Sequence, residues 1–168
     1  TAGVYVNDAE SGLLQDIVSN DKRVVIHLIA LVDEIETVYK HDEESFQRAL
    51  LLSLLADILA KHDVNLGNNV YRKVLNNFLT IDMDVLDKNE LFAHTLYELG
   101  TTYLLINQPY LAKISYQASL RIYKNIESDA SEKFKLTVAR LVSNIGRCHA
   151  ALQERLLAHE SFRNYLNL

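Results

Sequence analysis

Cysteine, glycine and proline are scarce in this sequence, and each shortage limits what the protein can be. The single Cys, Cys148, excludes an internal disulfide framework and suits a reducing compartment, so we expect a cytoplasmic protein. Five Gly are too few for a phosphate-binding loop, and neither a Walker loop nor a GxSxG motif occurs. No apolar run is long enough to cross a bilayer. We therefore expect no membrane association and no cofactor.

Basic residues are fewer than acidic residues, and the two are unevenly distributed along the chain. The net charge is −5, and residues 1–64 carry 5 Lys and Arg against 12 Asp and Glu, whereas residues 129–168 carry 6 against 4. No basic stripe with interleaved aromatic residues occurs, which disfavours direct binding to nucleic acid. The charge asymmetry has two interpretations: a solvated acidic face, which we favour, or a field along the molecule that would orient a protein partner.

The abundant feature is helical periodicity. The 168 residues are 49% hydrophobic, enough for one all-α domain spanning residues 1–168. Residues 91–124 contain two apolar-periodic segments separated by Asn107-Gln108-Pro109, the pattern of a helical hairpin. Pro109, the only proline, suits the first turn of the second helix because the missing N–H costs no intrahelical bond there. We expect Gly100 and Ala112 to lie where the two helices cross closely.

The small and aromatic positions of this hairpin recur 46 residues later. The corresponding pairs are Gly100 with Gly146, Ala112 with Ala158, and Tyr116 with Phe162. A helix-pair period of this length is typical of a stacked helical solenoid. At these residues the sequence resembles the tetratricopeptide repeat family in a long-period form. The resemblance implies about four antiparallel helix pairs, with clear repeats at 91–124 and 139–168 and a degenerate repeat at 44–80.

The remaining segments fit this organisation. Residues 1–7 have no helical period and are expected to be irregular, whereas 8–20 and 22–40 show amphipathic helical patterns. Residues 46–62 predict an interior helix, with 63–69 as a turn and a partner helix from Val70 to Leu79, joined by a loop about two residues longer than in the hairpin at 91–124. Asp87 and Glu90 predict a capping box before residue 91, and Asp129 and Glu132 another for the next helix. The acidic residues 41–44 are interpreted as a helix start rather than a metal site.

Catalytic and metal-binding patterns are weak. None of the six His residues stands in an HExxH motif, so we predict neither a metal site nor an enzyme. His94 and Glu98 are one helical turn apart, which is more simply a pair on a helix surface than an active site. Cys148 lies between Arg147 and His149, but neighbours on a helix point about 100° apart, so a structural thiol is favoured over an activated one.

The tetratricopeptide resemblance implies a binding groove along the first helix of each pair. Its polar inner face would carry Ser53, Asp57, Lys61, His94, Tyr97, Glu98, Thr101, Arg140, Ser143, Asn144 and Arg147. The partner would be a protein or peptide segment, acidic where it meets the C-terminal end of the groove. Some family members hold a peptide carboxylate with Lys, Asn and Arg from three repeats, and here only Arg140, Asn144 and Arg147 match, all within one repeat.

Three functions remain open at this point. The favoured one is a scaffold that binds a partner segment in the concave groove. The alternative is a peptide-sensing C-terminal domain of a bacterial regulator, and the least favoured is an enzyme subunit using His94 and Glu98. Because the chain starts at Thr1 without Met and ends in an apolar stretch at 162–168, we also expect it to be part of a longer protein.

The C-terminal segment predicts self-association. A terminal solenoid helix needs a polar outer face, but apolar residues here spread over more than one stripe. These residues are Leu156, Leu157, Phe162, Tyr165, Leu166 and Leu168. We therefore expect this end to pack on a second copy or on further chain.

Overall fold

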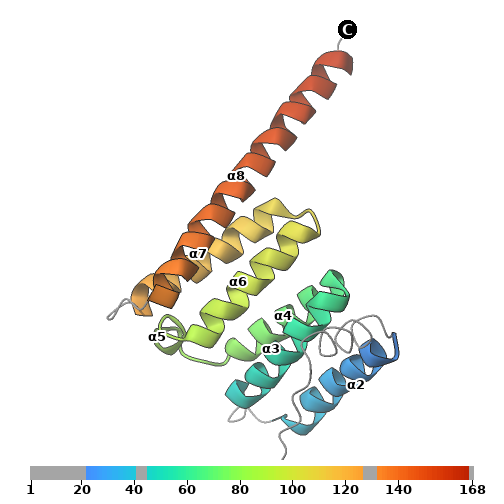
Figure 1. Ribbon diagram of the computed structural model, residues 1–168, viewed down its shortest axis with the longest axis vertical. Helices are drawn as coiled ribbons and strands as arrows, with labels where there is room; N and C mark the ends of the chain where they lie inside the picture. Colours follow the sequence, from blue (N-terminus) through green and yellow to red (C-terminus); the bar gives the residue numbers. More distant parts are fainter. Residues whose placement is uncertain (1–21, 41–44, 127–131, 167–168) are drawn as a thin grey trace, which may run out of the picture.

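The structure, a computed structural model, describes residues 22–40, 45–126 and 132–166. These residues form helices and no strand, so the all-α prediction is confirmed (Figure 1). The expected tail at 1–7, the helix at 8–20, the acidic segment at 41–44 and Asp129 lie outside the described residues. The helices are α2 (Lys22–Val38), α3 (Ser45–His62), α4 (Val64–Phe78), α5 (Met83–Leu86), α6 (Glu90–Leu105), α7 (Pro109–Ile126) and α8 (Glu132–Leu166).

The long helices pack largely in chain order. Helix α2 packs on α3, α3 on α4, α4 on α6, α6 on α7, and α7 on α8, with the pairs α3–α4 and α6–α7 forming antiparallel hairpins (Figure 1). One buried cluster joins α2, α3 and α4 and includes Leu86 of α5 and Leu99 of α6, and a second joins α6, α7 and α8. Leu75, Phe92 and Tyr103 pack against both clusters, so the two cores are continuous. The described helices between Lys22 and Leu166 include none that is both long and apolar enough to cross a membrane.

The α6–α7 hairpin matches the prediction for residues 91–124. Pro109 is the first residue of α7, and the connection turns at Asn107, whose φ is 64°. Gly100 is buried, but it faces the Tyr116 ring of α7, whose Cδ1 atom would lie 2.8 Å from an added Cβ. The predicted capping box was wrong by two residues, because Asn89 caps α6 by accepting a hydrogen bond from the Phe92 N–H.

The α3–α4 hairpin corrects the expected turn at 63–69. Asp63 alone connects the two helices, and its carboxylate accepts hydrogen bonds from the N–H groups of Asn65 and Leu66, so α4 begins at Val64 rather than Val70. The connection is thus shorter than that of α6–α7, not longer. Gly67 lies inside α4 against Ala60, where an added Cβ would clash with the α3 backbone. This glycine serves close helix packing rather than a turn.

The α3–α4 hairpin and the α6–α7 hairpin each contain a similar tyrosine contact. Tyr71 and Tyr116 are each seven residues beyond the first residue of their helix, and both are buried. The Tyr71 hydroxyl donates to Asp57 Oδ1 at 2.5 Å, and the Tyr116 hydroxyl donates to Thr101 Oγ1 at 3.1 Å. In both hairpins a tyrosine of the second helix therefore donates a hydrogen bond to a polar side chain of the first helix.

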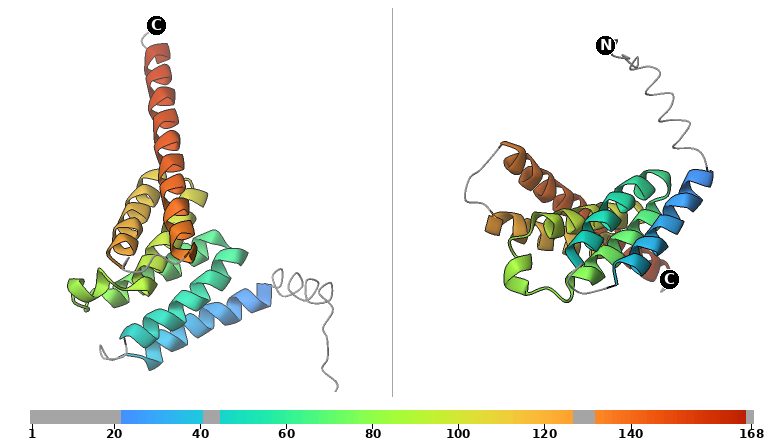
Figure 2. Two further views of the ribbon diagram at one scale, coloured as in Figure 1. Left: turned by 60° about the vertical axis from the view of Figure 1, so that its left-hand side comes forward. Right: turned by 90° about the horizontal axis from the view of Figure 1, so that it is seen from below.

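Helix α8 corrects the predicted repeat at 139–168. The structure has one continuous helix from Glu132 to Leu166 where a second hairpin was expected. Residues 150–157 contain no Gly, Pro or Asn and consist of good helix formers, so nothing ends the helix between Gly146 and Ala158. Gly146 is exposed, and a Cβ there would meet no atom within 4 Å. The helix packs on α7 through Leu141 and Cys148, then extends beyond the hairpins (Figures 1 and 2).

Candidate functional site

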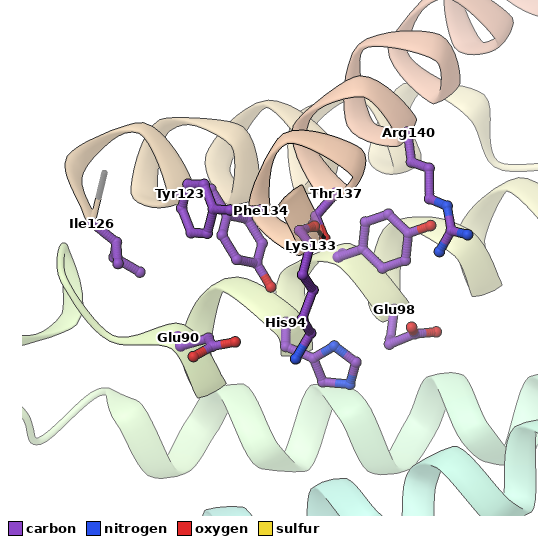
Figure 3. Close-up of a pocket in the computed structure, with 10 residues that line it drawn as sticks. Glu90, His94, Glu98, Tyr123, Ile126, Lys133, Phe134, Thr137 and Arg140 are labelled. Atoms are coloured by element: carbon purple, nitrogen blue, oxygen red, sulfur yellow. Dashed lines mark hydrogen bonds between the residues drawn. The ribbon is translucent and has the colours of Figure 1, made fainter. Parts of the chain in front are cut away.

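A pocket of about 530 Å³ opens between α6, the end of α7 and the start of α8 (Figure 3). Helix periodicity explains how each element contributes to it, because residues three, four and seven apart share one face of a helix. The lining residues are Glu90, His94, Tyr97 and Glu98 from α6, Tyr123 and Ile126 from α7, and Lys133, Phe134, Thr137 and Arg140 from α8.

Aromatic side chains form the walls of the pocket. Tyr123 and Phe134 meet edge to face with ring centroids 5.2 Å apart, which joins the end of α7 to the first turn of α8. Tyr97 meets the buried Tyr116 in the same way at 5.8 Å. Burial raises the pKa of Tyr123 to about 12, and the nearby charges of Glu90 and Glu98 contribute to the increase. The Tyr123 ring is therefore a neutral part of the wall at physiological pH.

His94 connects the pocket to α3. Its Nε2 atom lies 3.8 Å from Asp57 Oδ2, an ion-pair distance that is longer than a hydrogen bond. The Asp57 carboxylate raises the pKa of His94, while burial acts in the opposite direction. Burial alone would raise the pKa of Asp57, but His94 and the Tyr71 hydroxyl outweigh it and lower the value. The pair therefore favours a protonated His94 beside an ionised Asp57.

Glu98 is the most unusual group in the pocket. Burial raises the pKa of this carboxyl, and the charge of Asp57 adds to the effect while His94 opposes it. Within residues 22–40, 45–126 and 132–166, no group donates a hydrogen bond to Glu98 and no cation forms an ion pair with it. The carboxylate reaches the pocket wall below Arg140 in Figure 3. A largely buried acceptor without a donor is costly unless a ligand or water supplies one.

The structure brings together part of the predicted groove. Asp57 lies beside His94, and His94, Tyr97, Glu98 and Arg140 line one pocket. Lys61 is exposed on α3, and its charge helps to lower the pKa of Asp57.

Other predicted groove residues lie elsewhere or have structural partners. Ser53 was a wrong choice for partner contact, because it is only 2% exposed on a helix that packs against both α2 and α4. Thr101 accepts a hydrogen bond from Tyr116 and donates one to the Tyr97 carbonyl, so its role in the structure is internal. Asn144 and Arg147 lie beyond the pocket along α8, 3.5 Å apart, and the nearby Ser143 is exposed.

Sequence reasoning missed six of the lining residues. Tyr123 and Ile126 come from the end of a second helix, whereas the groove was assigned only to first helices. Lys133, Phe134 and Thr137 precede the predicted repeat at 139–168 but share a face with Arg140. The predicted helix start near Glu132, combined with the spacing of three, four and seven residues, was a usable signal for them. Glu90 stands two turns before Glu98 on the same face of α6 and was equally accessible to this reasoning.

Metal and thiol chemistry find little support in the described part of the chain. It contains no group of three or more His, Cys, Asp and Glu residues placed to hold a metal ion. Cys148 is fully buried between α7 and α8, and burial raises the pKa of its thiol despite the charge of Arg147. A buried protonated thiol is a poor nucleophile, which agrees with the structural role predicted for Cys148.

Comparisons with known proteins found no matching family model, no matching curated protein and no matching solved structure.

Proposed function

We propose that this chain is an interaction module, a tetratricopeptide-like array of helix pairs that holds a protein or peptide segment on the face shared by α3, α6 and α8. The proposal depends on the pocket of about 530 Å³, which combines aromatic walls from α6, α7 and α8 with charged and polar side chains from α6 and α8. Pockets of this size lined by aromatic side chains and a few oriented polar groups are typical of binding sites. The pocket has room for side chains of an extended segment rather than for a folded domain.

The shared Tyr contact of the two hairpins supports the repeat interpretation. Tyr71 and Tyr116 have the same position in their helices, and each donates a hydrogen bond to a polar side chain of the preceding helix, as expected for two copies of one helix-pair unit. Stacked units of this kind present an extended surface along their first helices. The basic residues Arg140 and Arg147 on α8 favour a segment with acidic residues at that end. A cytoplasmic location remains a prediction.

Selection of random peptides on the intact chain tests this function directly. We expect enriched peptides whose binding, measured by isothermal titration calorimetry, is weakened at least about tenfold by Tyr97→Ala, because aromatic anchors dominate such interfaces. The matched control is Tyr110→Ala, which removes an exposed tyrosine of α7 that does not line the pocket. Failure to enrich any peptide, together with turnover of a small molecule, would count against a binding module.

A peptide-sensing role is a second candidate, and one contact favours it. His94 lines the pocket and also pairs with Asp57 of α3, so a ligand touching His94 alters a contact between the two hairpins. Small-angle scattering with and without a selected peptide distinguishes the candidates. A sensor changes its radius of gyration on binding, and a passive scaffold does not.

A further inference from the structure

The two sides of the pocket carry opposite charges. Glu90 and Glu98 project from α6, while Lys133 and Arg140 project from α8 (Figure 3). The two cations are exposed, whereas Glu98 is largely shielded from water by its surroundings. In the described parts of the chain, neither cation forms an ion pair with Glu90 or Glu98. Glu98 is therefore an unused acceptor shielded from bulk water, whereas Glu90 and the two cations are solvated.

Aromatic rings surround this acidic side. Tyr97 precedes Glu98 on α6, and the Tyr123 hydroxyl lies in the fields of both Glu90 and Glu98. Phe134 packs edge to face on Tyr123 and completes the wall. Carboxylates beside aromatic faces suit a cation, because the faces attract positive charge and pack against the apolar stem that carries it.

We propose that the pocket binds a cationic side chain, arginine or lysine, of the partner segment, with its charged group at Glu98 and Glu90 and its stem against Tyr97, Tyr123 and Phe134. This inference rests on the proposed peptide-binding function and adds the residue that the pocket recognises. Arg140, exposed on α8, then faces the neighbouring part of the segment, where an acidic residue fits. The recognised segment is thus a cationic residue flanked by an acidic one.

An anionic group is the competing occupant of the pocket. A ligand carboxylate at Lys133 and Arg140 would leave Glu98 buried without a donor and would bring two negative charges together. A cation at Glu98 satisfies the shielded carboxylate and removes its desolvation cost, and charge-assisted hydrogen bonds of this kind are among the stronger ones. The geometry therefore favours a cation at the acidic side.

The test uses peptides selected from a random library on the intact chain. Each enriched peptide is resynthesised with citrulline in place of arginine or norleucine in place of lysine, which preserves length and removes the charge. Titration calorimetry gives the Kd for the wild-type chain, Glu98→Gln and Glu90→Gln. Glu34→Gln on α2 is the matched control, since it removes the same charge from an exposed site on a helix that contributes nothing to the pocket.

We expect the neutral peptide to bind the wild-type chain and Glu34→Gln at least about tenfold more weakly than the cationic peptide. Against Glu98→Gln the difference between the two peptides should shrink to a few-fold, because only the charge of Glu90 remains to recognise the cation. Glu90 is exposed, so Glu90→Gln should reduce the discrimination several-fold with no effect on folding. If Glu98→Gln melts at a lower temperature than the wild type, weaker binding could result from lost stability, and the comparison then depends on Glu90→Gln.

Other outcomes separate the two proposals. If Tyr97→Ala abolishes binding but the neutral peptides bind as well as the cationic ones, the binding module stands and cation recognition is wrong. Binding could instead be lost when a peptide carboxylate is removed, and lost equally in Arg140→Gln. That result would show that the pocket recognises an anion and would overturn the inference. If no peptide is enriched, both proposals fail.

Discussion

Two glycines in the middle of helices have opposite surroundings. Gly100 of α6 is buried, and a Cβ added there would lie 2.8 Å from Tyr116 Cδ1 and 2.9 Å from Tyr116 Cε1. The Tyr116 ring cannot easily give way, because it is buried against Tyr97 and its hydroxyl is bound to Thr101. Gly146 of α8 is exposed and has no neighbour within 4 Å of the same position. Of these two glycines, Gly100 is required for packing and Gly146 is not.

Substitution of each glycine by alanine should therefore change stability in opposite directions. Gly100→Ala is expected to lower the free energy of unfolding by about 1–3 kcal/mol through overpacking. Gly146→Ala should raise it by about 0.5–1 kcal/mol, since alanine restricts the unfolded chain and favours the helix. Urea titration of both variants checks the pair. Destabilisation by Gly146→Ala would mean that α8 forms a close crossing there after all.

Protonation at the edge of the pocket couples stability to pH. The charged and titratable groups around His94 are Asp57 and Lys61 on α3, Tyr71 on α4, Glu90 and Glu98 on α6, and Lys133 on α8. Folding raises the pKa of His94 above its ordinary 6.5, so its stabilising contribution is complete below pH 6.5 and is lost as pH rises through the folded value. The raised pKa of Glu98 acts in the same direction, because ionisation of the buried carboxyl costs stability above its ordinary 4.5. The lowered pKa of Asp57 matters only in acid, where stability is lost as pH falls below 3.8.

The chain should accordingly be more stable at pH 6 than at pH 8. The expected difference in free energy of unfolding is less than about 1 kcal/mol, because the His94 side chain is 40% exposed and solvent screens the pair. In His94→Gln this pH dependence should be largely lost, whereas His149→Gln, which alters an exposed histidine on α8, should keep it. Urea titrations at the two pH values measure it. An unchanged slope in His94→Gln would exclude His94 as the source.

At the scale of elements, the sequence predicted helices well and their ends less well. Apolar periodicity identified α2, α3, α6 and α7, and Asn107 with Pro109 marked the turn between the last two, because a residue with positive φ followed by proline strongly favours a break. Spacing alone misled at α8. Gly146 matches Gly100 in spacing, but no turn residues comparable to Asn107 and Pro109 follow it. The residues after Gly146 are good helix formers, so the segment stays one helix.

The sequence predicted which site residues share a face of one helix. It did not predict which residues of different helices come into contact. His94, Tyr97 and Glu98 share a face by periodicity alone. The contact of His94 with Asp57 depends on how α6 sits on α3 and α4, which no local pattern specifies. Ser53 was misplaced for the same reason, since its burial depends on which helices flank α3. Register between helices is set by packing and not by propensity.

A buried hydrogen bond joins the two hairpins. Asn68 of α4 donates its Nδ2 proton to Thr102 Oγ1 of α6 at 2.9 Å, and the Thr102 hydroxyl donates to the Leu99 carbonyl at 2.9 Å. Both side chains are buried. Removal of the hydroxyl would leave the Asn68 amide without this acceptor, and unsatisfied buried donors are costly.

Thr102→Val should therefore lower the free energy of unfolding by about 1–3 kcal/mol. The matched control is Thr137→Val on α8, where the hydroxyl bonds only to the Lys133 carbonyl one turn earlier, and the expected change is within about 0.5 kcal/mol. Urea titration of the two variants provides the comparison. Equal effects would show that Asn68 finds another partner and that the hairpins do not depend on this bond.

At the scale of the whole molecule, the described helices form an array with a long helix at one end. Helix α8 extends past the α6–α7 turn, and Arg155 is bound to Asn107 there by a hydrogen bond from Nη2 to Oδ1 at 2.6 Å (Figure 1). Apolar side chains are exposed around this contact: Leu105 and Tyr110 flank the turn, and Leu156 follows Arg155 with 66% of its surface exposed. Exposed apolar side chains gathered at one end of an array are typical of a surface that stacks on another unit.

Self-association through this end is the last prediction. We expect the chain to form a dimer, because burial of Leu156, Leu105 and Tyr110 against a second copy removes apolar surface from water. In light scattering over a dilution series, the weight-average mass should therefore fall from that of a dimer toward that of a monomer. Leu156→Glu should shift the midpoint to at least about tenfold higher concentration, since a charge buried in such an interface is unpaired. Leu79→Glu is the matched control, because Leu79 is even more exposed than Leu156 but follows α4, far along the array from the Arg155 contact. A chain that stays monomeric at the highest concentration would show that these side chains are scattered surface residues, as single exposed apolar residues often are.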